Sequence, residues 1–231
     1  MNWFDIHVIL FMNHFVNHWP WFDWLVTRAY STNVIGCGVT VALAWWALFD
    51  REAADQLTKG HELLLGAFLF CGLAALAARG LALSLPFRTR PIWSPAIHFQ
   101  VPHGSNSNLL GWSSFPSDHA ALLYALAIGI LFVSRPLGWL AIGWVAATIS
   151  FPALYLGVHW PTDVIVGAWL GVGFAYCSKI RPIREAIMRF TTSWHQQQIG
   201  LFFAVLFLWS YEIVDLFEDA RRLLKGLWHL I

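Results

Sequence analysis

Charged side chains are scarce in this 231-residue chain. Asp, Glu, Lys and Arg make up 12% of its residues, about half of what a soluble domain carries. The net charge is +1, so the composition excludes a strongly basic surface for nucleic acid and an acidic tail. Only three cysteines occur, each inside an apolar run without CxxC spacing, and we interpret them as buried free thiols.

Apolar residues are correspondingly abundant. Hydrophobic residues account for 58% of the chain, and the mean hydropathy is +0.58. This composition predicts an integral membrane protein. Several of the fifteen tryptophans flank the apolar runs, where an aromatic belt at the membrane interface is expected: Trp19, Trp21, Trp24, Trp93, Trp112, Trp160, Trp194 and Trp228.

The apolar runs predict an all-α, polytopic membrane helical bundle of about six transmembrane helices. Residues 1–30 contain an apolar but interrupted segment, which we expect to lie in the membrane interface. No repeat or linker divides the chain, so 1–231 is expected to form one domain ending in a span and tail at 199–231. The expected spans are Ser31–Phe49, Leu63–Leu85, Asp118–Ser134, Leu137–Gly157, Asp163–Ser178 and Ile199–Leu216.

Counting these spans places several polar residues on one side of the membrane. The second span ends, the third begins, the fourth ends and the fifth begins on that side, so Arg90, His119, His159 and Asp163 should emerge together. By the positive-inside rule the other side is cytoplasmic. Its loops hold Arg51, Lys59, Arg135, Lys179, Arg181, Arg184 and Arg189. We therefore expect the polar cluster to face the periplasm or exterior.

Two polar clusters have the residue types that phosphoryl transfer requires. Ser117 is a good N-cap for a helix beginning at Asp118, whose free N–H groups and His119 would then meet an anion. His159 and Asp163 are four residues apart, so the carboxylate could orient the imidazole as a nucleophile. The simpler alternative is that both clusters only cap helices, with the histidines as interfacial or packing residues.

A third element lies between the second and third spans. Arg90 precedes Pro91, and Arg88 lies two residues before it. A guanidinium can hold two phosphoryl oxygens at once. The alternative for an arginine at a membrane boundary is contact with lipid headgroups.

Together the three elements resemble the type 2 phosphatidic acid phosphatase superfamily. Its pattern is Lys-x6-Arg-Pro, then Pro-Ser-Gly-His, then Ser-Arg-x5-His-x3-Asp. This chain has Arg90-Pro91, Pro116-Ser117-Asp118-His119 with Asp for Gly, and His159-x3-Asp163. It looks most like the bacterial undecaprenyl-diphosphate phosphatase branch, and the similar region, 63–178, would be the catalytic core.

The resemblance implies a role for each matching residue. His159 would be the nucleophile that forms a phosphohistidine, Asp163 would orient it, and His119 would be the general acid. Arg90, Ser117, Asp118 and Arg88 would hold the substrate phosphate. The resemblance implies no metal and no cofactor. The expected partner is a polyprenyl phosphate or diphosphate lipid in a bacterial inner membrane, not a nucleic acid.

Two family residues are missing. Leu83 stands where the family has lysine, and Ala153 stands where it has the arginine of the third motif. Either Arg88 or Arg79 reaches in, or activity is impaired. The sequence therefore predicts dephosphorylation of undecaprenyl diphosphate and leaves two alternatives open. These are a lipid phosphotransferase with the same intermediate and a non-catalytic lipid-phosphate binder.

Overall fold

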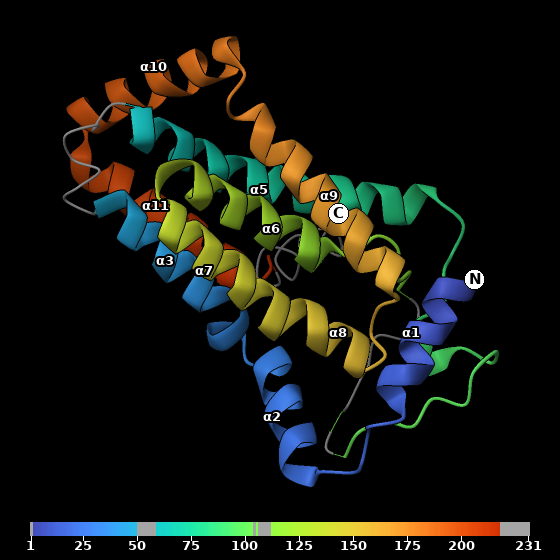
Figure 1. The fold of residues 1–231 in the computed structure, drawn as a ribbon. Helices are drawn as coiled ribbons and strands as arrows, with labels where there is room; N and C mark the ends of the chain where they lie inside the picture. Colours follow the sequence, from blue (N-terminus) through green and yellow to red (C-terminus); the bar gives the residue numbers. More distant parts are fainter. Residues whose placement is uncertain (1, 50–58, 104, 106–111, 218–231) are drawn as a thin grey trace, which may run out of the picture.

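The computed structural model describes residues 2–49, 59–103, 105 and 112–217. Within these ranges the chain folds into helices without any strand (Figure 1), which confirms the predicted all-α class for this part of the protein. The helices are α1 (Trp3–Asn13), α2 (Pro20–Ser31), α3 (Val39–Phe49), α5 (Lys59–Ser84), α6 (Asp118–Val133), α7 (Arg135–Val145), α8 (Phe151–Tyr155), α9 (Pro161–Cys177), α10 (Arg181–Gln197) and α11 (Ile199–Val214). Three short helical segments are η1 (Val34–Gly38), η2 (Pro91–Trp93) and η3 (Ala146–Ser150).

The six apolar runs expected to span the membrane are all helical, but they differ in length. Among the described residues, only Glu62–Ser84 and Arg135–Tyr155 are long and apolar enough to cross a membrane alone. Two pairs reach that length when each counts as one bent span: α2 with η1 and α3, bent by 68°, and α9 with α10, bent by 71°. Helices α6 and α11 are shorter. This measure gives two to four spans, so the predicted number of six is not confirmed.

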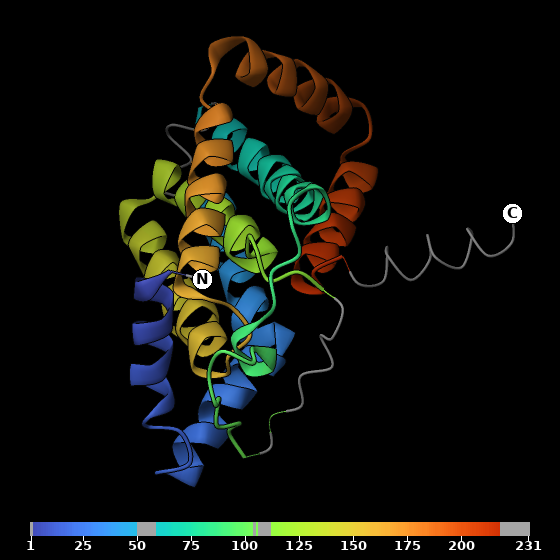
Figure 2. The ribbon, with the colours of Figure 1, turned by 90° about the vertical axis from the view of Figure 1, so that its right-hand side faces the viewer.

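Helix α6 lies at the centre of the bundle, with α3, α5, α7 and α9 packed around it (Figures 1 and 2). Its side chains are buried on several faces, as expected of a helix that is apolar all round. Two of the cysteines, Cys37 and Cys71, lie in this core as free thiols, whereas Cys177 is only partly buried. The central position of α6 fixes where its first turn, which carries His119, meets its neighbours.

Two glycines allow α9 to approach α6 closely. A Cβ atom on Gly167 would lie 2.4 Å from the carbonyl oxygen of Ser117, and one on Gly171 would lie 2.3 Å from that of Ala121. Small residues at such contacts let helix backbones pack tightly within a membrane. The first turns of α6 and α9 are therefore held side by side.

Substituting these glycines tests the packing. Gly171→Ala should lower the stability of the protein by about 1–3 kcal/mol, because the new methyl group overlaps the backbone of α6. Gly173→Ala, two residues on, is the matched control, since its Cβ meets nothing within 4 Å. Thermal unfolding of the purified protein in detergent measures both. Equal melting temperatures for the two variants would contradict this account of the helix contact.

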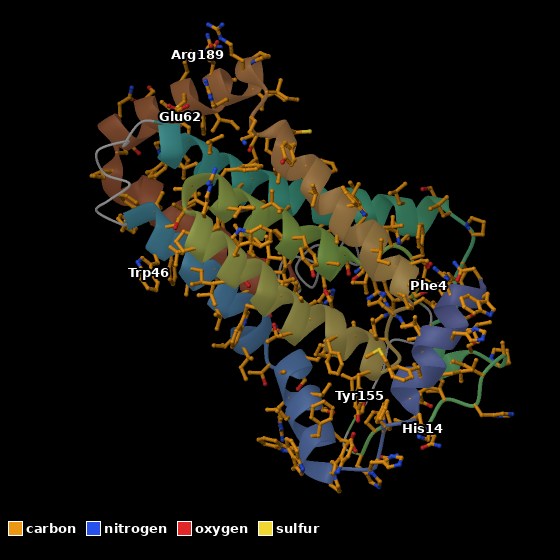
Figure 3. All side chains as sticks on the ribbon, in the orientation of Figure 1. Phe4, His14, Trp46, Glu62, Tyr155 and Arg189 are labelled. Atoms are coloured by element: carbon orange, nitrogen blue, oxygen red, sulfur yellow. The ribbon has the colours of Figure 1, made fainter. Side chains whose placement is uncertain are left out.

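The two ends of the bundle differ in character. Figure 3 shows Glu62 and Arg189 at one end and Tyr155 and His14 at the other. The first end carries the amphipathic helix α10, which the search for apolar runs did not predict, and Arg184 on this helix pairs with Glu62 at 3.5 Å. Arg51 and the side chain of Lys59 lie outside the described residues. The basic residues of α10 therefore lie at the end away from the first turns of α6 and α9 (Figure 1).

The tryptophans only partly follow the predicted aromatic belt. Trp19, Trp21 and Trp24 are exposed, as a belt residue must be. The prediction for Trp160 is wrong, because its side chain is completely buried and its indole N–H donates to the carbonyl of Thr89 at 2.8 Å. Trp228 lies outside the described residues. Trp160 thus belongs to the internal support of the polar cluster rather than to the membrane interface.

Candidate active site

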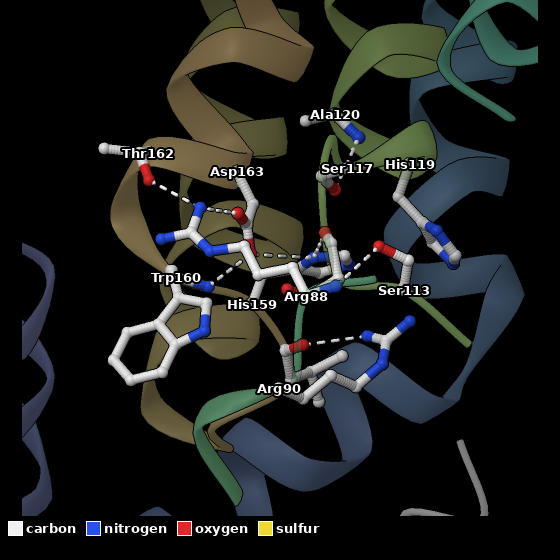
Figure 4. A network of polar contacts seen from close by, with 12 residues as sticks. Arg88, Arg90, Ser113, Ser117, His119, Ala120, His159, Trp160, Thr162 and Asp163 are labelled. Carbon is white, nitrogen blue, oxygen red and sulfur yellow. Dashed lines mark hydrogen bonds and ion pairs between the residues drawn. The ribbon is translucent and has the colours of Figure 1, made fainter. Parts of the chain in front are cut away.

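The two polar clusters meet where α6 and α9 begin (Figure 4). The backbone N–H of Ser117 donates to the carbonyl of Asp163 at 3.1 Å, which joins the residue before α6 to the first turn of α9. Ser117 also caps α6 as predicted, because its hydroxyl accepts from the N–H of Ala120 at 3.4 Å. Residues 46 positions apart in sequence thus share one junction at one end of the bundle.

His159 lies in the turn between α8 and α9 and is almost fully buried. Its Nδ1 is 2.8 Å from the carbonyl oxygen of Ser114. Because a carbonyl only accepts hydrogen bonds, Nδ1 carries the hydrogen and Nε2 keeps its lone pair. Burial lowers the pKa of His159, although the nearby Asp163 carboxylate opposes that effect. The imidazole is therefore neutral near pH 7, the form that a nucleophile needs.

The carbonyl that orients His159 is itself held in place. The N–H of Ser114 donates to the carbonyl of Arg88 at 2.9 Å, and the N–H of Arg88 donates to the Ser113 hydroxyl at 3.3 Å. These bonds join the segment after α5 to the segment before α6. Sequence reasoning did not single out Ser114 for this role, because a backbone carbonyl leaves no signal in the residue type.

Asp163 contacts His159 less directly than the sequence predicts. Its Oδ2 lies 3.7 Å from Nδ1 of His159 but accepts from the N–H of Trp160 at 2.8 Å, which caps α9. Its Oδ1 accepts from Arg88. Helix α9 begins only at Pro161, so the four-residue spacing is not one turn of a helix here. Asp163 instead stabilises the turn that presents His159.

His119 is held by a second carboxylate. Its Nδ1 lies 2.8 Å from Oδ1 of Asp118, and Oδ2 of Asp118 accepts from Arg79 at 2.6 Å. The Arg79 guanidinium in turn lies 4.4 Å from the centre of the Trp112 ring. The side chain of Asp118 thus orients His119 through one ring nitrogen. The Asp118 carboxylate is turned to Arg79 and His119, whereas the family resemblance predicted that it would hold the phosphate.

The expected anion site at the start of α6 is largely used within the protein. The N–H of Ser117 donates to Asp163, that of His119 to the Asp118 carboxylate, and that of Ala120 to the Ser117 hydroxyl. These donors are occupied in this arrangement. The cation for a bound phosphate must therefore come from elsewhere.

Arg90 has the donors that such an anion needs. Its side chain is 7% exposed, and one Nη donates to the carbonyl of Val158 at 2.8 Å. Its Nε and the Ser114 hydroxyl are buried, and neither has a hydrogen-bond partner among the described residues. Buried polar atoms normally have partners, so these two indicate a ligand. Burial lowers the pKa of Arg90, against the charges of Asp118 and Asp163, but a guanidinium stays charged in proteins.

Arg88, the other predicted phosphate ligand, is enclosed by two carboxylates. It pairs with Asp163 through one Nη and with Asp5 of α1 through the other. It also donates to the Thr162 hydroxyl at 2.9 Å. Asp5 is fully buried and accepts from the N–H and the hydroxyl of Thr162 at 2.9 and 2.8 Å. This group, the Asp5–Arg88–Asp163 cluster, fastens α1 to the first turn of α9.

Sequence reasoning treated Asp5 only as an interruption of an apolar segment. A carboxylate within such a segment is costly unless a cation pairs with it. That cost was a signal that Asp5 has a buried partner, but the partner, 83 residues away, could not be identified without the fold.

Asp5→Asn tests the cluster. The variant should lose about 3 kcal/mol of stability, near the lower end of the range for breaking a buried ion pair. The loss is not larger because Arg88 still pairs with Asp163. His7→Ala, an exposed change on the same helix, should have little effect. Thermal unfolding in detergent compares the two variants. An Asp5→Asn protein as stable as His7→Ala would show that the cluster does not hold α1.

The two residues that replace family cations, Leu83 and Ala153, differ in burial. Leu83 is 79% exposed on the surface of α5, whereas Ala153 is 2% exposed beside Ala120 and Val164. The two arginines that might replace the missing cation are both paired with carboxylates, Arg79 with Asp118 and Arg88 with Asp5 and Asp163. Neither takes the place of the third-motif arginine in this arrangement.

The arrangement supplies three chemical functions in one place: a buried neutral imidazole, a second imidazole paired with a carboxylate, and a guanidinium with an unused donor. These suit nucleophilic attack, protonation of a leaving group and binding of an anion. Within the described ranges, no group of three or more His, Cys, Asp and Glu side chains could hold a metal ion.

Comparison with known proteins agrees with this chemistry. The family model described as the PAP2 superfamily matches residues 64–186, more than half of the chain. The undecaprenyl-diphosphatase BcrC of Bacillus subtilis is 29% identical over 154 residues, which cover 64% of this chain and 72% of the relative.

Two further relatives match over shorter regions. An undecaprenyl-diphosphatase of Sulfolobus acidocaldarius is 37% identical over 65 residues, covering 28% of this chain and 32% of the relative. A lipid A 4'-phosphatase of Bacteroides thetaiotaomicron is 44% identical over 63 residues, covering 26% of this chain and 28% of the relative. The chain thus spans about a third or less of these two proteins. No solved structure matches the chain significantly.

Proposed function

Because this chain belongs to the PAP2 superfamily, we propose that it is a membrane phosphatase that converts undecaprenyl diphosphate, or a similar polyprenyl diphosphate, to the monophosphate. The observation that carries the proposal is the state of His159. Its Nδ1 is engaged by the Ser114 carbonyl at 2.8 Å, which leaves Nε2 as the reactive nitrogen, and Arg90 supplies a buried Nε without a partner among the described residues. The names of two relatives, both undecaprenyl-diphosphatases, suggest the substrate class.

In the first step, Nε2 of His159 attacks the terminal phosphorus of the lipid diphosphate. A bond forms between nitrogen and phosphorus, and the bond from phosphorus to the bridging oxygen breaks. His119, protonated on both nitrogens and stabilised by Asp118, gives the proton from its outer nitrogen to the departing lipid monophosphate. Arg90 offsets the negative charge on the transferring group.

In the second step, water hydrolyses the phosphohistidine. His119, now neutral, takes a proton from the water molecule as its oxygen attacks phosphorus. The nitrogen–phosphorus bond breaks, inorganic phosphate leaves, and both histidines return to their starting states. Asp118 supports His119 in both steps because it accepts from the same ring nitrogen throughout.

The expected activity is release of phosphate from undecaprenyl diphosphate by the purified protein. His159→Ala should lower kcat at least on the order of 10⁴-fold, since the nucleophile is lost, and should abolish any acid-labile phosphoprotein trapped by acid quench. His119→Ala should slow formation of that phosphoprotein. His14→Ala, an exposed change on the N-terminal segment, is the control and should behave as wild type.

Three results would contradict the proposal. Undiminished turnover by His159→Ala would remove the nucleophile. Phosphate that leaves only when an acceptor lipid is added would indicate a phosphotransferase. Binding of the lipid without turnover, together with activity gained on Ala153→Arg, would indicate a disabled enzyme that binds lipid phosphates.

We further propose that six helical segments cross a bacterial inner membrane and that the site faces the periplasm or exterior. Support comes from the arginines of α10, which lie at the opposite end of the bundle (Figure 1) and match the positive-inside rule. In this orientation the diphosphate of a lipid in the outer leaflet meets the first turns of α6 and α9.

Cysteine labelling tests this orientation. In a variant with Cys37, Cys71 and Cys177 changed to alanine, His98→Cys reports on the loop beside the site and Arg189→Cys on α10. Both native residues are exposed. A membrane-impermeant maleimide should label His98→Cys in intact cells and Arg189→Cys only after the membrane is opened. The reverse pattern would overturn the orientation.

A further inference from the structure

A tyrosine from a distant part of the chain packs beside the position of the missing third-motif arginine. Ala153 forms a small buried cluster with Ala120 and Val164, and the ring of Tyr30 packs against this cluster. Tyr30 lies in the last turn of α2, 123 residues before Ala153. Because the alanine side chain at position 153 is small, its neighbours fill the space that an arginine side chain would need.

Tyr30 also contacts the proposed general acid. Its ring is stacked on the imidazole of His119, with 6.2 Å between the ring centres and 16° between the planes. Its hydroxyl lies within electrostatic range of Arg90 and Asp118. The phenol therefore stacks on one residue of the proposed site and lies within electrostatic range of two others.

The hydroxyl of Tyr30 has no hydrogen bond to another described residue, although the side chain is half-buried. Two other tyrosines show the contrast. The Tyr124 hydroxyl is 3.1 Å from that of Ser150, and the Tyr155 hydroxyl donates to Asp23. Because the Tyr30 hydroxyl is not fully enclosed, it stays accessible to a ligand. A phosphoryl oxygen bound at Arg90 would be one.

We propose that Tyr30 is a further catalytic residue, whose hydroxyl donates a hydrogen bond to a non-bridging phosphoryl oxygen from the space that the third-motif arginine would otherwise use. Its ring also keeps His119 in position by stacking. This inference rests on the proposed phosphatase function. A phenol is a neutral donor and offsets less charge than a guanidinium does, so the site relies on Arg90 as its cation.

Tyr30→Phe removes the hydroxyl and keeps the ring. We expect kcat for undecaprenyl diphosphate to fall on the order of 100-fold, as when one preorganised donor to a developing charge is lost, with KM changed much less. Inhibition by orthovanadate, which mimics the transferring phosphoryl group, should weaken in parallel. Tyr124→Phe is the matched control, because Tyr124 packs against the same cluster but its hydroxyl is paired with Ser150.

A second pair of variants tests the shared space. Tyr30→Ala should be poorly active, and adding Ala153→Arg should restore part of the activity, because a guanidinium can then enter the vacated position. Ala153→Arg in the presence of Tyr30 should not raise activity. If it raises activity as much with Tyr30 present as without it, Tyr30 does not occupy that position.

The outcomes separate this inference from the function on which it rests. A wild-type protein without phosphatase activity would overturn the function, and orthovanadate binding would still compare Tyr30→Phe with wild type. An active wild type whose kcat and orthovanadate affinity are unchanged in Tyr30→Phe would overturn the role of Tyr30 alone. Melting temperatures equal to that of Tyr124→Phe show that a loss in Tyr30→Phe does not come from unfolding.

Discussion

Asp163 connects three parts of the site through three different atoms. One carboxylate oxygen accepts from the N–H of Trp160 and begins α9, and the other accepts from Arg88. Its backbone carbonyl accepts from the N–H of Ser117 and joins α9 to α6. A buried carboxylate is stable only with such compensation. The placement of both histidines therefore depends on this one residue, although neither makes its shortest contact with it.

The two histidines are oriented by different kinds of acceptor. His159 meets a backbone carbonyl, which carries no net charge, and burial keeps the ring neutral as a nucleophile must be. His119 meets the Asp118 carboxylate, which carries a full negative charge. The residue that provides this carboxylate, Asp118, stands where the family has glycine. Its negative charge is partly offset by the ion pair with Arg79. The two imidazoles thus differ in environment because one contacts a neutral carbonyl and the other a carboxylate.

The sequence predicted those features that depend on local pattern. The start of α6 at Asp118, its Ser117 cap and the helical nature of the apolar runs follow from capping chemistry and hydropathy. Counting spans predicted that His119, His159 and Asp163 would emerge on one side. Asp5, Tyr30 and the Ser114 carbonyl could not be found in this way, because each acts through a contact between distant segments. Trp160 was misjudged because a tryptophan beside an apolar run can point inward as readily as outward.

The length of α6 has a consequence for where the chemistry takes place. Its 16 residues rise about 24 Å, less than the hydrocarbon thickness of about 30 Å. A helix this short at the centre of the bundle leaves its first turn recessed below the level that a full-length span would reach. Under the proposed function, the phosphate of a lipid would have to descend below the headgroup level to meet the first turn of α6.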